Sequence, residues 1–361
     1  MWARITSAIG RPIDATMAKQ IRRVRPPPRP FADPLTRQIA AQIERDFGAF
    51  VPPFALHAAA PQVLAACWMM LREALVTTHV DRRRKEAVAS AVSRANACTY
   101  CVDAHTAALH ALGDPTTADA LATPDGRIAG DDPLATLVAW AEATRAADDP
   151  RLRVPPFPRD ETPEMTAVAF CFHYINRMVA LFLAPSPLPF ASPRLKAIAR
   201  RALAPVLAGQ LRHALAAGEA LPFLPDAPLP PDLAWAAPHP TVAAAFARAA
   251  AGIEAAAAAV LSPAVRTRVG EMLAGWRGAD PGLGRAWLAD AVAPLAERDR
   301  PPARLALLTA LAPFQVDDAT IAEFRRSAPG DAALVAATAW ASFTSARRIA
   351  SWVTGAGARA A

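Results

Sequence analysis

The chain has 361 residues, of which 53% are hydrophobic and 20% charged, so it is long enough for two domain-sized units and too apolar for a disordered protein. Its net charge of +7 comes almost wholly from arginine, and the arginines are scattered without an aromatic-interleaved basic stripe. This pattern argues against a nucleic-acid partner and favours a solvated basic surface. Four cysteines are too few for a secreted disulfide scaffold.

The first residues lead into no continuous apolar core of signal-peptide length, and no run approaches the roughly 18 apolar residues of a membrane span. We therefore expect a cytoplasmic protein with no membrane partner. In a reducing compartment, a C-x-x-C pair is more often catalytic than structural.

Residues 1–32 are basic and rich in proline, which predicts an arm that either moves freely or wraps the surface. From Asp33 onward, apolar residues recur at helical spacing and tyrosine is rare, so the chain is predicted to be all-α. The segments with helical periodicity are 35–47, 61–76, 81–95, 98–112, 133–145, 162–183 and 193–217.

The interval 221–240 is crowded with prolines and is the best candidate for a linker. Beyond it the first half recurs, because residues 262–292 can be laid over 81–111 at a constant offset of 181. This predicts a first unit at 33–220 and a degenerate second unit at 241–361. In the overlay, the positions opposite Glu86, Cys98, Cys101 and His105 are Thr267, Ala279, Gly282 and Ala286, none of which can do the same chemistry.

The residues that carry chemistry lie in one short stretch of the first unit. Cys98 and Cys101 fall at a predicted helix start, where unpaired backbone N–H groups and the positive end of the helix dipole favour a thiolate. His105 lies four residues after Cys101 on the same helix face, where its imidazole can take the thiol proton. Glu86, from the preceding helix, can orient His105 or relay its proton through water.

A thiolate activated in this way can attack a peroxide O–O bond and become a sulfenic acid, which the second cysteine then converts to a disulfide. The contact expected between His105 and Cys101 favours Cys101 as the attacking thiol and Cys98 as the resolving one. The position of Cys98 at the helix start favours it as the thiol that meets the reductant. The cycle requires no metal or organic cofactor, but an external dithiol must reduce the disulfide.

The stretch from Glu86 to His105 resembles the signature of the alkylhydroperoxidase family, which shares its all-helical (AhpD-like) fold with the carboxymuconolactone decarboxylases. The flanking segments 42–48 and 172–177 also resemble family segments, and the likeness is greatest to two-unit actinobacterial members over most of residues 35–355.

The resemblance implies reduction of organic hydroperoxides, recharging by a lipoyl-bearing or thioredoxin-like partner, and a proton relay through Glu86 and His105. It also implies a homo-oligomer, here a dimer or trimer of chains. One departure concerns the relay, because Tyr100 stands where the peroxidases have a histidine before the second cysteine.

Three alternatives remain at the level of sequence. Cys98, Cys101 and His105 can be three zinc ligands, with Cys67, His79 or Cys171 as the fourth. The pair can also serve a redox-responsive binding protein that does not turn over. A cofactor-free lyase or isomerase of the decarboxylase type would not need the cysteines at all.

Other residues have structural interpretations. Cys67 and Cys171 are expected to be buried small hydrophobes, and His110 to be solvated or capping a helix. Tyr100, Asn176 and Arg177 either line the site or pack between helices. Trp340 and Trp352 are expected in the core or a subunit interface, and His57, His79, His173, His213 and His239 show no partner pattern.

Overall fold

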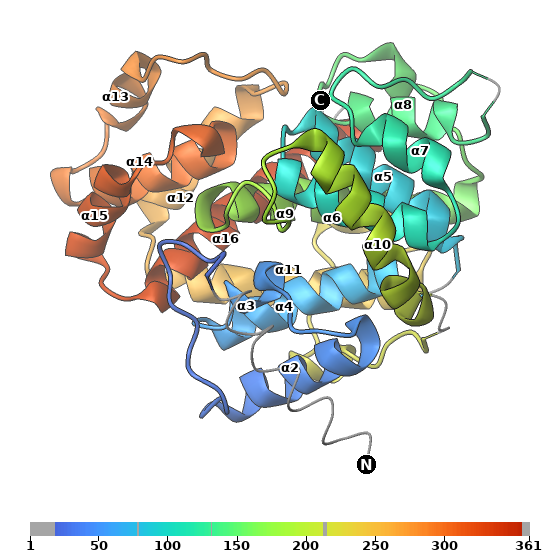
Figure 1. Cartoon of the computed structure of the whole chain (residues 1–361). Helices are drawn as coiled ribbons and strands as arrows, with labels where there is room; N and C mark the ends of the chain where they lie inside the picture. The colour runs from blue at the N-terminus through green and yellow to red at the C-terminus, as the bar shows by residue number, and fades with distance from the viewer. Residues whose placement is uncertain (1–18, 78, 131, 212–214, 356–361) are drawn as a thin grey trace.

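The computed structural model describes residues 19–77, 79–130, 132–211 and 215–355. Within these residues the protein is helical and has no β-strand (Figure 1). An isolated antiparallel β-bridge pairs Ile21 with Leu183. The predicted all-α fold is therefore confirmed.

The first half of the chain forms helices close to those that the periodicity predicts. Seven α-helices of the described chain begin on a proline, whose missing N–H and fixed φ suit the first helical position. This explains how a helical protein accommodates 36 prolines. The helices of this half are α2 (Pro34–Phe47), α3 (Pro52–Ala55), α4 (Pro61–Leu71), η1 (Arg72–Val76), α5 (Arg82–Ala95), α6 (Thr99–Ala111), α7 (Pro115–Leu121), α8 (Ala135–Ala143), η2 (Pro150–Leu152), η3 (Arg159–Glu161), α9 (Thr162–Phe182) and α10 (Pro193–Leu211).

The second half is helical as well, and its first long helices follow the predicted repeat. Helix α12 begins at Pro263, 181 residues after the start of α5 at Arg82, which is the offset of the overlay. The counterpart of α6 is shorter, because α13 begins only at Ala286. The division into two units stays a prediction. The helices of this half are α11 (Pro240–Ala258), α12 (Pro263–Gly275), α13 (Ala286–Val292), η6 (Glu297–Asp299), α14 (Arg300–Leu311), η7 (Pro313–Gln315), α15 (Asp318–Ser327) and α16 (Asp331–Val353).

One hydrophobic core runs through both halves. Helix α9 packs along α16, and α4 packs along α11, so each of these contacts joins a helix of the first half to one of the second (Figure 1). In helix α4 every residue from Val63 to Leu71 is buried. The burial on all sides follows from its position between α2, α9 and α11.

Two segments, Arg159–Phe182 and Pro240–Ala258, are long and apolar enough to span a membrane by length and composition. The expectation that no segment reaches this length is therefore wrong. These segments are apolar because they pack in the core of the fold. Of the most apolar 18-residue stretch, 94% is buried in the first segment and 44% in the second.

The interval predicted as a linker is ordered and packed. It contains η4 (Leu221–Phe223) and η5 (Pro231–Ala236), and Leu224 and Leu233 are buried in the common core. This segment connects the halves while adding to the core between them.

The described part of the basic arm, residues 19–32, lies on the surface of both halves. The backbone N–H of Arg22 donates to Phe182 O at 2.6 Å, and Ala184 N–H donates to Gln20 O at 2.9 Å. Arg23 forms an ion pair with Asp318 at 2.8 Å, on the first turn of α15. The arm thus wraps the surface here; the rest of the predicted arm, 1–18, lies outside the described residues.

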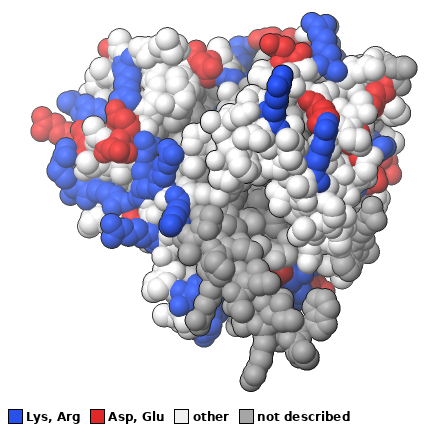
Figure 2. Space-filling model, in the orientation of Figure 1, with Lys and Arg blue, Asp and Glu red and all other residues white. Residues whose placement is uncertain are grey.

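Charged side chains of both signs interleave over α13, α14 and α15 on the face shown in Figure 2. Several of these arginines are in ion pairs, for example Arg285 with Asp317 and Arg304 with Glu323. Basic side chains outnumber acidic ones over these helices, and part of the surplus is in ion pairs (Figure 2).

Candidate active site

The cysteine pair lies at a sharp turn between two packed helices. Helix α5 ends at Ala95, Ala97 adopts a left-handed φ of 54°, and Cys98 is the N-cap residue of α6. The backbone N–H of Cys98 donates to Ser93 O at 2.8 Å, which fixes the turn. As the sequence predicted, α6 begins at Thr99, and the turn lets α6 run back along α5.

This packing brings Glu86 and His105 together. The Oε2 of Glu86 lies 2.6 Å from His105 Nδ1, and its Oε1 accepts a hydrogen bond from Arg82 Nε at 2.7 Å. Burial alone would raise the pKa of Glu86, but Arg82 and His105 together lower it to about 2. The carboxylate is therefore ionised at neutral pH and fixes the imidazole, whose ring also packs edge-on against Phe172.

Cys101 is buried among polar side chains that belong to other helices. Its pKa is raised well above the usual value of a thiol by the hydrogen bond with Cys98 and by burial, while the side chains of Asn176 and Ser93 act in the opposite direction. Both cysteines are buried free thiols, with 7% of Cys98 and 3% of Cys101 exposed.

A chain of hydrogen bonds extends from Asn176 into the core. The amide of Asn176 donates to Ser93 Oγ at 3.1 Å, and Asn96 donates to Asn176 Oδ1 at 3.0 Å. Asn96 also contacts His173 Nδ1 at 3.1 Å, and His173 Nε2 lies 2.8 Å from Thr144 Oγ1. Burial lowers the pKa of His173 well below its usual value, so this imidazole is neutral.

Sequence reasoning missed most of this network. Ser93 follows Glu86 by seven residues, which is two helical turns, so helix periodicity places it on the same face of α5. That signal was present in the sequence. Asn96 and His173 carry no comparable pattern, because they meet only after α5 and α9 pack.

A cavity of about 370 Å³ opens at the pair between the two halves of the chain. Of the four predicted site residues, Cys98 is the one that lines it, together with Tyr100 and Asn176 from the first half. The opposite wall comes from the second half and includes Trp276, Asp280, Leu311, Pro313 and Phe314. A second half without site residues thus still shapes the space in front of Cys98.

Three arginines, Arg22, Arg145 and Arg177, give this cavity a positive surplus over its one carboxylate. Arg145 binds that carboxylate, Asp280, at 2.6 Å. Arg177 is buried and donates to Ala310 O at 3.0 Å, and burial lowers its pKa to about 9, so it stays charged at neutral pH. Arg177 therefore frames the pocket and also joins α9 to α14.

Tyr100 both lines the cavity and packs there. Its hydroxyl donates to Gln20 Oε1 at 2.9 Å, which connects the residue between the cysteines to the arm. Burial raises the pKa of Tyr100, so its hydroxyl stays protonated. The side chain is thus a hydrogen-bond donor and no substitute for a titrating histidine.

The remaining sequence assignments divide into two groups. Cys67 and Cys171 are buried as expected, and Trp340 is 5% exposed in the core. His110 differs from the expectation, because its ring contacts Asp119 at 3.1 Å and its side chain is 4% exposed. His57 and His79, for which no partner was foreseen, contact Tyr174 at 2.8 Å and Glu164 at 3.1 Å, respectively.

Comparison with known proteins places the chain in a family. The model of the carboxymuconolactone decarboxylase family matches residues 61–143, which contain the cysteine pair, Glu86 and His105. The chain is similar to a curated alkyl hydroperoxide reductase of Mycobacterium tuberculosis, with 39% identity over 316 residues, covering 88% of this chain and 90% of the relative. No solved structure matches significantly. The chain therefore belongs to the enzyme family of alkylhydroperoxidases with the carboxymuconolactone decarboxylase-like fold.

Proposed function

We propose that this protein is a thiol-dependent peroxidase that reduces organic hydroperoxides through a dithiol–disulfide cycle of Cys98 and Cys101. The observation that carries the proposal is the position of Cys98 on the wall of a cavity, hydrogen-bonded to Cys101, with the Glu86–His105 pair on the same two helices. The name of the M. tuberculosis relative supports a hydroperoxide as the substrate.

In the first step, the thiolate of Cys98 attacks the terminal oxygen of a hydroperoxide ROOH. The O–O bond breaks, RO⁻ leaves and takes a proton to become ROH, and Cys98 becomes a sulfenic acid. The thiol of Cys101 then forms the S–S bond and water leaves. A dithiol reductant restores both thiols by exchange and is itself oxidised to a disulfide.

The attacking thiol is assigned to Cys98, although the sequence alone favoured Cys101. Cys98 lines the cavity where a peroxide enters, and it caps the N-terminus of α6, where a negative charge is stabilised. Cys101 does not line the cavity and lies in hydrogen-bond contact with Cys98, which suits it to the resolving step.

In this mechanism His105 and Glu86 move the proton. The ionised carboxylate of Glu86 accepts from Nδ1–H of His105, which leaves Nε2 free to take a proton and later return one. His105 lies one helical turn after Cys101, so the proton of Cys98 reaches it through the hydrogen bond between the two thiols. No metal or organic cofactor is needed for these steps.

The reductant is expected to be a lipoyl-bearing or thioredoxin-like dithiol. The cysteine pair is buried, so the reductant must carry its two thiols on a group narrow enough to reach the disulfide. Such partners work in a reducing compartment, so the cytoplasm remains the expected location. A dimer or trimer also remains a prediction. The apolar side chains of Leu195, Ile198 and Val206, exposed on α10, are the described surface best suited to such a contact.

The test is stopped-flow oxidation of the fully reduced protein by cumene hydroperoxide, with Cys98→Ser and Cys101→Ser beside it. We expect fast stoichiometric disulfide formation in the parent protein. Cys101→Ser should stop at a sulfenic acid that a dimedone probe captures, and Cys98→Ser should react no faster than a free thiol. The opposite result for the two variants would reverse the assignment, and slow oxidation of the parent protein would reject the peroxidase.

A further inference from the structure

A second cluster of chemical side chains lies away from the cysteine pair. It consists of His79, Glu164 and His239, whose ligand atoms all lie within 4.8 Å of one another. Glu164 is on the first turn of α9, 12 residues and so roughly 18 Å along the helix from Asn176 at the cysteine site. The cluster therefore belongs to a separate place in the fold.

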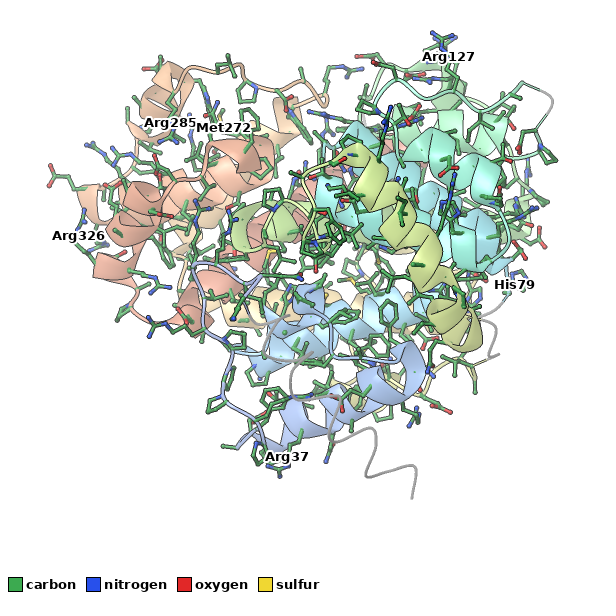
Figure 3. The ribbon with its side chains drawn as sticks, in the orientation of Figure 1. Arg37, His79, Arg127, Met272, Arg285 and Arg326 are labelled. Atoms are coloured by element: carbon green, nitrogen blue, oxygen red, sulfur yellow. The ribbon has the colours of Figure 1, made fainter. Side chains whose placement is uncertain are left out.

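The three residues come from three different segments. His79 precedes α5, and Figure 3 shows it at the outer margin of the molecule. His239 is the N-cap residue of α11, at the end of the segment that connects the two halves. The cluster thus joins the connecting segment to the first half.

The distances fit a metal site. The Oε1 of Glu164 lies 3.1 Å from His79 Nδ1 and 3.2 Å from His239 Nε2. Around Zn²⁺ with bonds of about 2.0–2.2 Å, neighbouring ligand atoms of a tetrahedral site lie roughly 3.3–3.6 Å apart. The two carboxylate–imidazole distances fall short of this range by only a few tenths of an ångström, and all three ligand atoms lie within 4.8 Å of one another.

One oxygen of the cluster, Oε1 of Glu164, lacks a well-formed hydrogen bond. Although two ring nitrogens lie so close to it, Glu164 Oε1 is buried and has no hydrogen-bond partner of acceptable geometry. Metal ligands show this arrangement because each lone pair points at the shared ion and not at the neighbouring ligand atom. The carboxylate is 1% exposed, so water does not satisfy this oxygen in place of a partner.

The surroundings hold the carboxylate for such a role. Its other oxygen, Oε2, forms an ion pair with Lys85 and accepts from Val80 N–H at 3.3 Å, which leaves Oε1 directed at the imidazoles. The second ring nitrogen of His239, Nδ1, accepts the backbone N–H of Val242 at 3.5 Å and lies 3.3 Å from Thr241 Oγ1, and these contacts hold the ring with Nε2 toward Glu164. Half of His79 is exposed, which opens a path for an ion and room for a water ligand.

We propose that His79, Glu164 and His239 form a binding site for a divalent transition metal, with Zn²⁺ the best match to two imidazoles and one carboxylate. Three protein ligands leave the fourth tetrahedral position to water. The ion ties the connecting segment at α11 to the first turn of α9, and it is independent of the peroxide cycle.

The test is calorimetric titration of the full-length chain with ZnCl₂, in a background of Cys98→Ser and Cys101→Ser so that the thiols cannot compete for the ion. We expect one Zn²⁺ per chain. Either His79→Ala or His239→Ala should weaken binding at least tenfold, whereas the control His110→Ala should leave it unchanged. His79 is half exposed, so its replacement does not endanger folding.

A second readout identifies the ligands. Co²⁺ bound to the same protein should give the visible bands of a tetrahedral nitrogen–oxygen site, and these should disappear in His79→Ala. The proposal is overturned if no zinc binds at micromolar concentrations, or if zinc binds equally to His79→Ala. Either result would leave the cluster without a metal-binding role.

Discussion

The carboxylate of Glu86 is buried between one permanent cation, Arg82, and one imidazole, His105. It therefore has two roles, because the ion pair with Arg82 keeps it ionised and the contact with His105 orients the ring. A neutral amide in its place would keep the size of the side chain but lose the charge that stabilises a protonated imidazole.

We predict that Glu86→Gln slows oxidation by cumene hydroperoxide by about 100-fold, the usual scale of one general acid–base group. In the parent protein the pKa of Glu86 falls from 4.5 to about 2 on folding, so the ionised carboxylate stabilises the fold by roughly 3 kcal/mol above pH 4.5. Because the folded-state pKa is lowered, this contribution is lost as the pH falls toward 2. The stability difference between the parent protein and Glu86→Gln, measured by urea denaturation, should shrink over that window.

The control is Glu161→Gln, which breaks the more exposed ion pair with Arg84. It should leave the oxidation rate unchanged. A Glu86→Gln variant that oxidises at the parent rate would remove Glu86 from the relay.

At this scale the sequence predicts a candidate site of Glu86, Cys98, Cys101 and His105, because all four lie within 20 residues on two consecutive helices, and their catalytic role stays a prediction. It named Asn176 as a residue that lines the site or packs between helices, but it could not predict the hydrogen bond of Asn176 with Ser93, which lies some 80 residues earlier in the chain. Nor could spacing alone choose the attacking thiol. That choice depends on a cavity whose opposite wall comes from the second half.

At the scale of elements, the end of α14 and η7 supply the apolar wall opposite Cys98. Phe314 is 55% exposed, so its side chain can be removed without opening the core. The matched control is Leu283, which is 91% exposed in the same half and does not line the cavity.

We predict that Phe314→Ala raises the KM for cumene hydroperoxide about three- to tenfold, since loss of a partly buried aromatic contact costs about 1 kcal/mol. The KM for hydrogen peroxide should stay unchanged, because that substrate is too small to reach the wall. Steady-state kinetics with both peroxides check this. Equal effects of Phe314→Ala and Leu283→Ala would contradict a substrate site between the halves.

The loop before α13 docks on the first half by close approach of two backbones. Gly278 has a φ of +102°, and a Cβ there would lie 1.9 Å from the carbonyl oxygen of Arg145. The adjacent Ala147 N–H donates to Arg277 O at 3.0 Å. Only glycine meets both conditions, the positive φ and the lack of space.

We predict that Gly278→Ala lowers the free energy of unfolding by about 1–3 kcal/mol, the usual cost of a strained backbone conformation. Urea denaturation measures the change. Gly284→Ala is the control, because that site is in the same loop and a Cβ there meets no atom within 4 Å. A loss of stability no greater than in Gly284→Ala would show that the loop does not depend on this contact.

Hydrophobic periodicity predicts where the helices lie but not how the proline-rich segment packs. It predicted α5, α6 and α9 to within a few residues, because caps and prolines mark their ends. It did not predict that 221–240 is packed, since proline-rich segments have no period from which burial can be inferred. The buried Leu224 and Leu233 belong to a core that exists only when both halves are present.

At the scale of the whole molecule, the core contains two neutral imidazoles, His57 and His173. His57 lies 2.8 Å from both Pro53 O and Tyr174 Oη, and burial lowers its pKa from 6.5 to about 4. The pKa of His173 is lowered in the same direction. The unfolded chain therefore binds these two protons at a higher pH than the folded chain does.

We predict that the free energy of unfolding falls as the pH decreases from about 6.5 to about 4. Unfolding takes up as many as two protons in this range, so the slope reaches about 2.7 kcal/mol per pH unit. Urea denaturation at a series of pH values measures the slope. His57→Gln should remove about half of it, whereas His79→Gln, at a half-exposed site, should not. A stability that is constant over this range would contradict the neutral burial of both rings.

The central claim is catalytic turnover at the Cys98–Cys101 pair, and its most direct test is the number of peroxides that each chain consumes. Cumene hydroperoxide is supplied in 100-fold excess with dihydrolipoamide as the reductant, and the alcohol product is quantified. The account predicts many equivalents of alcohol per chain for the parent protein and none above background for Cys98→Ser combined with Cys101→Ser. A parent protein that stops at one equivalent, or a double variant that continues, would contradict it.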